Sequence, residues 1–271
     1  MIKKLFIRIF KGPANPTFEQ VVRRKTTVSF LWFAVAIVFA FGFWKWLNAQ
    51  PRDARALRPL RMVMNANEKI FATLFYSNNN VAPTYNAMRA AKRVRVNGKA
   101  GMDEKFDATT WKLKVVRTPG DTLFLSLDAI KALPKTEIIF DFKCVEGWDQ
   151  VTHWGGVKFS DFAAKYNVGA VNNAVPDLKD YSNLYPYAGL ETPDKKYFVS
   201  MDMPSMLHPQ TLLCYEMNGK PLPDNQGFPL RLITPVKYGV KNIKRIGTIF
   251  FSNTQPRDYW AERGYDYYLG L

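Results

Sequence analysis

The feature that most constrains the fold of this chain is a run of 19 uncharged residues between Lys25 and Lys45. As a helix the run would be roughly 28 Å long, about the thickness of the hydrocarbon core of a bilayer. Trp44 and Trp46 lie at one end, where aromatic side chains favour the membrane interface. The run is apolar on every face, which disfavours a core helix, and its length disfavours a cleaved signal peptide. We therefore predict a transmembrane anchor at residues 26–47.

The positive charge of the chain is concentrated around this anchor. The net charge is +15, but residues 1–61 hold 12 Lys/Arg with only Glu19 and Asp53, whereas the other 210 residues hold 26 Lys/Arg and 21 acidic residues. This distribution fits a membrane surface and argues against a nucleic-acid partner. The chain then divides into a basic segment at 1–25, the anchor at 26–47, a linker at 48–69 and one domain at 70–271.

The domain shows short strand and helix patterns in irregular alternation. Strands are predicted at 92–98, 111–118, 136–144, 197–203, 229–235 and 244–253, and helices at 126–134 and 160–166, the second capped by Ser160. Interleaved elements of this kind predict an α+β fold with a mixed sheet.

Cys144 ends the apolar strand at 136–144, on the same face as Ile138, Phe140 and Phe142. Only one other cysteine, Cys214, is present, so a disulfide framework is excluded. A buried cysteine is most often a small apolar filler. The position at the end of a strand also suits a metal ligand, and the residue pattern alone leaves both interpretations open.

Four blocks together decide between them: CVEGW (144–148), LHPQTLLCYEMNGKPLP (207–223), GFPLRLITP (227–235) and KYGVKNIKRI (237–246). In this order they resemble the molybdopterin-binding domain of the sulfite oxidase family, over roughly residues 70–262. The blocks are most similar to the branch of periplasmic methionine sulfoxide reductases. The resemblance implies a sulfite oxidase-type fold and one molybdenum-molybdopterin per chain. It also implies that Cys144 is the metal ligand and catalytic residue, a role that suits a soft thiolate.

The same resemblance implies a set of cofactor-binding residues. Arg231 would bind the pterin phosphate through its planar fork. The tripeptide 242–244 would bind the pterin, and Cys214 would be an inert core thiol. The full set is Asn79, Asn80, Thr192, His208, Gln226, Arg231, Asn242, Ile243 and Lys244.

The resemblance implies an oxidoreductase that transfers an oxygen atom. Glu146 and Asp149 follow Cys144 where sulfite oxidases have an arginine, which favours a neutral S-oxide or N-oxide, small or protein-bound, over a dianion. The aromatic residues expected to line the pocket are Trp148, Trp154, Tyr185 and Tyr187. Electrons would come from a membrane haem protein or another donor. The expected location is the inner membrane, with one span and the domain in the periplasm. The alternatives are sulfite oxidase-like oxidation of another small substrate and a metal-free, membrane-tethered binding protein.

Overall fold

The structure is a computed structural model that describes residues 15–74, 80–103, 105–177 and 180–270. The chain divides into two compact units, which are described separately. One unit is Met1–Asp53 with Leu57–Met62, and the other is Ala54–Ala56 with Val63–Leu271.

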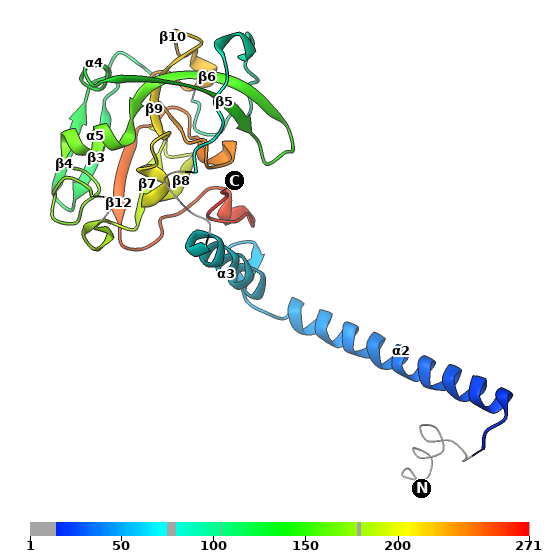
Figure 1. Cartoon of the computed structure of the whole chain (residues 1–271). Helices are drawn as coiled ribbons and strands as arrows, with labels where there is room; N and C mark the ends of the chain where they lie inside the picture. Colours follow the sequence, from blue (N-terminus) through cyan, green and yellow to red (C-terminus); the bar gives the residue numbers. More distant parts are fainter. Residues whose placement is uncertain (1–14, 75–79, 104, 178–179, 271) are drawn as a thin grey trace. The chain divides into compact units, whose positions relative to one another are not determined.

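The first unit is dominated by helix α2 (Phe18–Asn48), which contains the apolar run (Figure 1). The helix begins at a capping box, in which Thr17 accepts from the Gln20 amide and the Gln20 side chain accepts from the Thr17 amide. None of its residues is buried, and α2 is long and apolar enough to cross a membrane by length and composition. The short strands β1 (Arg52–Asp53) and β2 (Ala56–Leu57) and helix α3 (Arg58–Leu74) follow. The boundary between the units falls within β2 and α3, since residues 54–56 and those from Val63 onward belong to the second unit.

The second unit is built on two five-stranded sheets. The first is antiparallel, with the order β10 (Lys220–Pro221), β9 (Leu212–Met217), β6 (Asp149–Lys158) and β5 (Lys135–Lys143), and β11 (Arg231–Ile233) also pairs with β9. The second has the order β4 (Asp121–Leu125), β3 (Leu113–Thr118), β12 (Thr248–Ser252), β7 (Tyr187–Glu191) and β8 (Phe198–Asp202). Since β12 runs parallel to β3 and antiparallel to β7, this sheet is mixed, and the predicted α+β class is confirmed.

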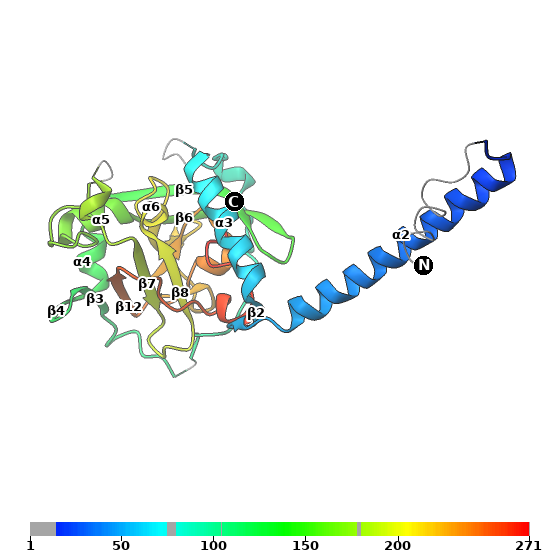
Figure 2. The same cartoon turned by 90° about the horizontal axis from the view of Figure 1, so that it is seen from below.

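Short helices complete this unit: α4 (Leu127–Lys131), α5 (Phe159–Tyr166) and α6 (Met203–Met206). Figures 1 and 2 both place α4 and α5 at the end of the unit that carries β3 and β4. The larger core cluster takes side chains from both sheets and from α5. A smaller cluster packs Ile138, Phe140, Trp154 and Cys214 on one face of the antiparallel sheet.

Two local predictions were wrong. Residues 92–98 form no strand, because their backbone is bonded by side chains: Gln150 accepts from the Arg95 amide, and Gln226 donates to the Arg95 carbonyl. Ser160 does not cap α5, which begins one residue earlier, at Phe159, and has no side-chain cap.

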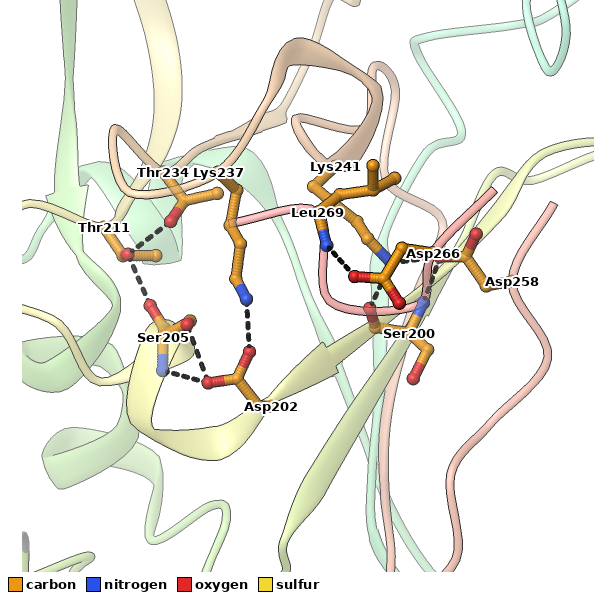
Figure 3. Close-up of polar contacts among 10 residues, drawn as sticks. All are labelled: Ser200, Asp202, Ser205, Thr211, Thr234, Lys237, Lys241, Asp258, Asp266 and Leu269. Atoms are coloured by element: carbon orange, nitrogen blue, oxygen red, sulfur yellow. Dashed lines mark hydrogen bonds and ion pairs between the residues drawn. The ribbon is translucent and has the colours of Figure 1, made fainter. Parts of the chain in front are cut away.

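A buried polar network ties the segment after β11 to strand β8 (Figure 3). Lys237 pairs with Asp202 at 2.7 Å, and Lys241 donates to the Ser200 carbonyl at 2.9 Å and to Asp258 at 2.5 Å. Both lysine side chains are about 1% exposed, so solvent screens these pairs little. The network therefore fixes the turn at 239–241, which leads directly into residues 242–244.

Candidate active site

The loop between β5 and β6 presents the Cys144 thiol. Its ends are joined by a hydrogen bond from the Cys144 amide to the Trp148 carbonyl (2.9 Å), and the Gly147 amide donates to the Cys144 carbonyl (3.0 Å). Gly147 has φ +84°, a conformation that glycine adopts without strain. The thiol is 7% exposed and lies in the wall of a cavity of about 310 Å³.

Arg231 places a buried positive charge in the same cavity wall. Its guanidinium donates to the Gln226 backbone and side chain (2.9 and 3.0 Å) and to the Asn242 carbonyl (3.3 Å), and it stacks 4.4 Å from the Trp154 ring. Burial lowers its pKa to about 10, which leaves it charged at neutral pH. Among the residues that the structure describes, no carboxylate pairs with Arg231, and its Nε has no hydrogen-bond partner.

Lys244 adds a second cation to the cavity lining. Its Nζ donates to three backbone carbonyls, of Asn97 (2.7 Å), Asn225 (3.0 Å) and Gly98 (3.4 Å). Burial and, as the smaller cause, the charge of the nearby Arg231 lower its pKa to about 8. Two neighbouring cations bonded mainly to neutral carbonyls form a site suited to an anion.

Gln226 and Asn242 also line the cavity, but their side chains are engaged within the protein. The Gln226 amide donates to the Val94 and Arg95 carbonyls (3.3 and 3.2 Å). The Asn242 side chain accepts from the Thr234 amide (2.7 Å) and donates to the Tyr238 carbonyl (3.1 Å). Both residues therefore shape the cavity, and any contact from Asn242 to a ligand would come from its backbone.

Asn97 was missed by the sequence reasoning. Its Nδ2 lies 3.9 Å from the Cys144 sulfur, within hydrogen-bond range for sulfur, and its side chain also bonds Glu146. It comes from a segment 47 residues earlier in the chain, so no local spacing relates it to Cys144. The Asn-Gly pair at 97–98, a typical turn sequence at the end of the expected strand, is the signal that could have drawn attention to it.

The rim of the cavity carries both acidic and basic side chains, among them Glu146, Arg95 and Lys99. Glu146 accepts from the Trp148 indole at 3.1 Å, and Arg95 stacks 4.6 Å from the Trp148 ring. Hydrogen bonds from Asn97 and Trp148, together with the charge of Arg95, lower the pKa of Glu146. Since Arg95 offsets Glu146, the absence of an arginine beside Cys144 does not make the rim acidic.

Four aromatic residues from the C-terminal part of the chain complete the lining: Tyr197, Tyr259, Trp260 and Tyr265. Trp148 and Trp154 line the cavity as expected, whereas Tyr185 and Tyr187 do not. Tyr185 packs instead on Phe251 in the larger core, with ring centroids 6.2 Å apart.

The other expected cofactor residues lie outside this lining. Thr192 is buried and bonds Asp194 (2.6 Å), and Ile243 belongs to the larger core cluster. His208 is buried, with its Nε2 3.3 Å from the Asn80 carbonyl, and burial lowers its pKa and favours the neutral ring. Asn79 lies outside the described residues. The structure thus brings together Cys144, Gln226, Arg231, Asn242 and Lys244.

The cavity has the chemistry that a molybdopterin requires. One wall offers a single thiol, the ligand type that a soft metal prefers. The lining also offers Arg231, whose buried Nε has no hydrogen-bond partner among the described residues, and Lys244, both suited to a phosphate. The aromatic lining suits a planar ring system. The residues present therefore fit the group.

Comparison with known families agrees with this chemistry. Residues 100–260 match the model of the family described as "oxidoreductase molybdopterin binding domain". The match covers more than half of the chain, and the chain belongs to this family. Membership of this family places the chain in the class of molybdenum-dependent oxidoreductases.

The curated relatives are named as methionine sulfoxide reductases. A putative protein-methionine-sulfoxide reductase subunit, YedZ1 of Azospira oryzae, is 34% identical over 71% of this chain and 69% of its own length. The protein-methionine-sulfoxide reductase catalytic subunits MsrP of Campylobacter jejuni and Xanthomonas campestris are 33% and 35% identical, over 62% and 56% of this chain. The chain spans 59% and 48% of the lengths of these two proteins.

Among solved structures, the sulfane dehydrogenase SoxCD from Paracoccus pantotrophus is similar with a TM-score of 0.44 and 14% identity. The match covers 56% of this chain and 40% of that chain. At this level the likeness does not bear on function.

Proposed function

We propose that this chain is a membrane-anchored, molybdopterin-dependent reductase that removes the oxygen atom from an S-oxide or N-oxide, of which methionine sulfoxide is the type. The observation that carries the proposal is the cavity that joins the Cys144 thiol to the buried cation Arg231 and the partly buried cation Lys244. The names of the relatives supply the substrate class.

One molybdopterin per chain would bind in this cavity, with the Cys144 thiolate as the protein ligand of the molybdenum. When bound, the cofactor supplies two-electron oxygen-atom transfer. Arg231 and Lys244 would hold the phosphate, and the Asn97 amide would hydrogen-bond the thiolate. The remaining expected residues stay proposals for the pterin contacts: Asn79, Asn80, Thr192, His208, Gln226, Asn242 and Ile243.

The net reaction would convert a sulfoxide, two electrons and two protons into a thioether and water. Trp148, Tyr259 and Trp260 offer apolar ring surface to the methyl and methylene groups of a neutral sulfoxide. Arg95 at the rim is the one observation that favours the second candidate, sulfite oxidase-like oxidation of a small anion. Steady-state rates with methionine sulfoxide and with sulfite would separate the two.

The chain organisation proposed is a basic segment at 1–25, an anchor at 26–47, a linker at 48–69 and the catalytic domain at 70–271. The length and apolar composition of α2 support a single membrane span. The location that we propose is the inner membrane, with the domain in the periplasm. Electrons would come from a membrane haem protein or another donor. The alternative is a metal-free, membrane-tethered binding protein. Molybdenum in the purified chain would exclude this alternative, and a folded chain without molybdenum would support it.

The deciding experiment measures molybdenum and pterin per chain for the full-length protein made in a host that synthesises the cofactor. About one molybdenum per wild-type chain is expected. Cys144→Ala should lose the metal or its native spectrum, because the thiolate ligand is gone. Cys214→Ala is the matched control, since Cys214 is buried in the core and does not line the cavity. A folded wild type without molybdenum would contradict the proposal.

A further inference from the structure

Helix α3 carries a stripe of exposed apolar side chains. The stripe consists of Leu60, Val63, Ile70, Phe71 and Leu74, which are 47–68% exposed. With 3.6 residues per turn, these positions fall within about 100° of the helix circumference and extend over about 21 Å. Asn67 is the one polar residue on this arc. Single exposed apolar residues are ordinary, but five on one side of a helix mark a contact surface.

A different side of α3 faces the catalytic domain. Glu68 is partly buried and interacts electrostatically with Asp266, Lys237 and Asp202 of the domain. Burial and the charge of Asp266 raise the pKa of Glu68. The side of α3 that carries Glu68 therefore packs against the domain, and the apolar stripe on another side of the helix stays exposed.

The chain connection keeps α3 close to α2. Helix α2 ends at Asn48 and α3 begins at Arg58, so nine residues join them. Fully extended, nine residues reach at most about 32 Å. If α2 spans a bilayer, α3 must begin within that distance of its surface.

The charge around α3 favours lipid as the occupant of the stripe. Residues 49–74 contain five Lys/Arg and two acidic residues, and Arg52, Arg55 and Arg58 are exposed. Cations next to a membrane span are attracted to anionic lipid head groups. The stripe itself holds four aliphatic residues and one phenylalanine, without the Trp, Tyr and Arg anchors that dominate protein interfaces. A helix with one apolar side and a cationic flank is typical of a helix that lies in the membrane interface.

We propose that the apolar stripe of α3 lies in the head-group region of the bilayer that α2 spans, so that the membrane holds the catalytic domain at two places. The inference rests on the membrane anchor of the proposed function. It assigns a role to residues 58–74 that a flexible linker would not have.

The test uses the full-length chain in vesicles of phosphatidylethanolamine and phosphatidylglycerol that contain no other protein. The photoreactive amino acid p-benzoylphenylalanine replaces Ile70 or Leu74 in the stripe. It replaces Asn65 or Lys69 as matched controls, which are exposed on another side of the same helix. Phe39 in α2 is the positive control for the span. Lipid adducts are quantified by mass spectrometry after irradiation.

Lipid adducts at positions 39, 70 and 74, several-fold above those at 65 and 69, are the expected result. Adducts at 39 with only control yields at 70 and 74 would overturn the inference and leave the anchor intact. No adduct at 39 would reject the anchor itself. In native membranes, a protein adduct in place of lipid at 70 and 74 would assign the stripe to a partner and overturn the proposal.

Discussion

At the scale of single residues, the candidate site combines one reactive thiol with two cations that the protein leaves without a carboxylate partner among its described residues. Arg231 and Lys244 are both largely withdrawn from water, and a buried charge is costly unless it is paired. Backbone carbonyls offset part of this cost. An anionic cofactor would offset more, which makes the two side chains sensitive reporters of cofactor binding.

Arg231→Lys should weaken cofactor retention although it keeps the charge. Lysine cannot reproduce the planar fork that bonds Gln226 and Asn242 and leaves Nε for a ligand. Loss of one charge-assisted hydrogen bond, worth about 1.5–3 kcal/mol, predicts roughly tenfold weaker binding or more. Molybdenum per chain after dialysis measures this. Arg257→Lys, at an exposed ion pair with Glu262, should retain the wild-type content.

Anion binding should weaken as pH rises through the pKa of Lys244. This pKa is lowered to about 8, so Lys244 is mostly charged at pH 7 and mostly neutral at pH 9. The affinity of the cofactor-free chain for sulfate, which stays a dianion over this range, should therefore fall between these pH values. Calorimetric titration measures it. Lys244→Met should bind more weakly at pH 7 and lose most of the dependence; an unchanged dependence would assign it to another group.

At the scale of elements, the antiparallel sheet positions the site through the β5–β6 hairpin and its contact with β9. Strand β6 shifts register against β9 between Gly155 and Gly156. A Cβ at Gly156 would lie 2.2 Å from the Leu213 carbonyl oxygen, whereas one at Gly155 would meet only side-chain atoms at 3.1–3.2 Å. The backbones of β6 and β9 therefore approach each other closely at Gly156 and not at Gly155.

Gly156→Ala should destabilise the domain by about 1–3 kcal/mol, the usual cost of overpacking. Gly155→Ala should cost less, because its nearest contacts, side-chain atoms of Glu216 and Lys135 at 3.1–3.2 Å, need to shift by only a few tenths of an ångström. Thermal unfolding of the two variants, followed by circular dichroism, compares them directly. Equal effects would show that the register shift does not depend on close contact at Gly156.

The elements differ in how far the sequence could predict them. The strands β3 and β5 were predicted from alternating side chains, the pattern of a sheet with one buried face. The strands β8 and β12 were also predicted, although their burial does not alternate. Residues 92–98 alternate in the same way, yet their partners are the side chains of Gln150 and Gln226, which periodicity cannot reveal. Cys144 and Arg231 were found through motifs. Asn97 and Arg95 were missed because tertiary structure alone brings them to the cavity.

At the scale of the whole molecule, the cavity is built entirely from residues of the second unit. Among the described residues, none from α2 or from the segments before Val94 lines the cavity. We therefore expect the catalytic chemistry to be separable from the proposed membrane span of α2.

Cleavage of the connection between α2 and α3 should leave the site intact. Trypsin should cut after the exposed Arg52 and Arg55, whereas Pro59 protects the bond after Arg58. The resulting fragment contains all of the cavity lining and should keep the molybdenum content of the uncut chain. Mass spectrometry identifies the cut, and metal analysis of the purified fragment measures retention. Metal loss on cutting would show that the first unit contributes to the site.

Because the two cysteines differ in accessibility, labelling of their thiols can measure what fraction of the chains is folded and carries the cofactor. Cys144 faces the cavity, whereas Cys214 is 0% exposed and burial raises its pKa, so only the first can react in the native protein. Brief treatment with iodoacetamide should therefore add no label to loaded chains, one to folded empty chains and two to unfolded chains. A single intact-mass spectrum would then count all three populations in one preparation, without a spectroscopic signal from the metal.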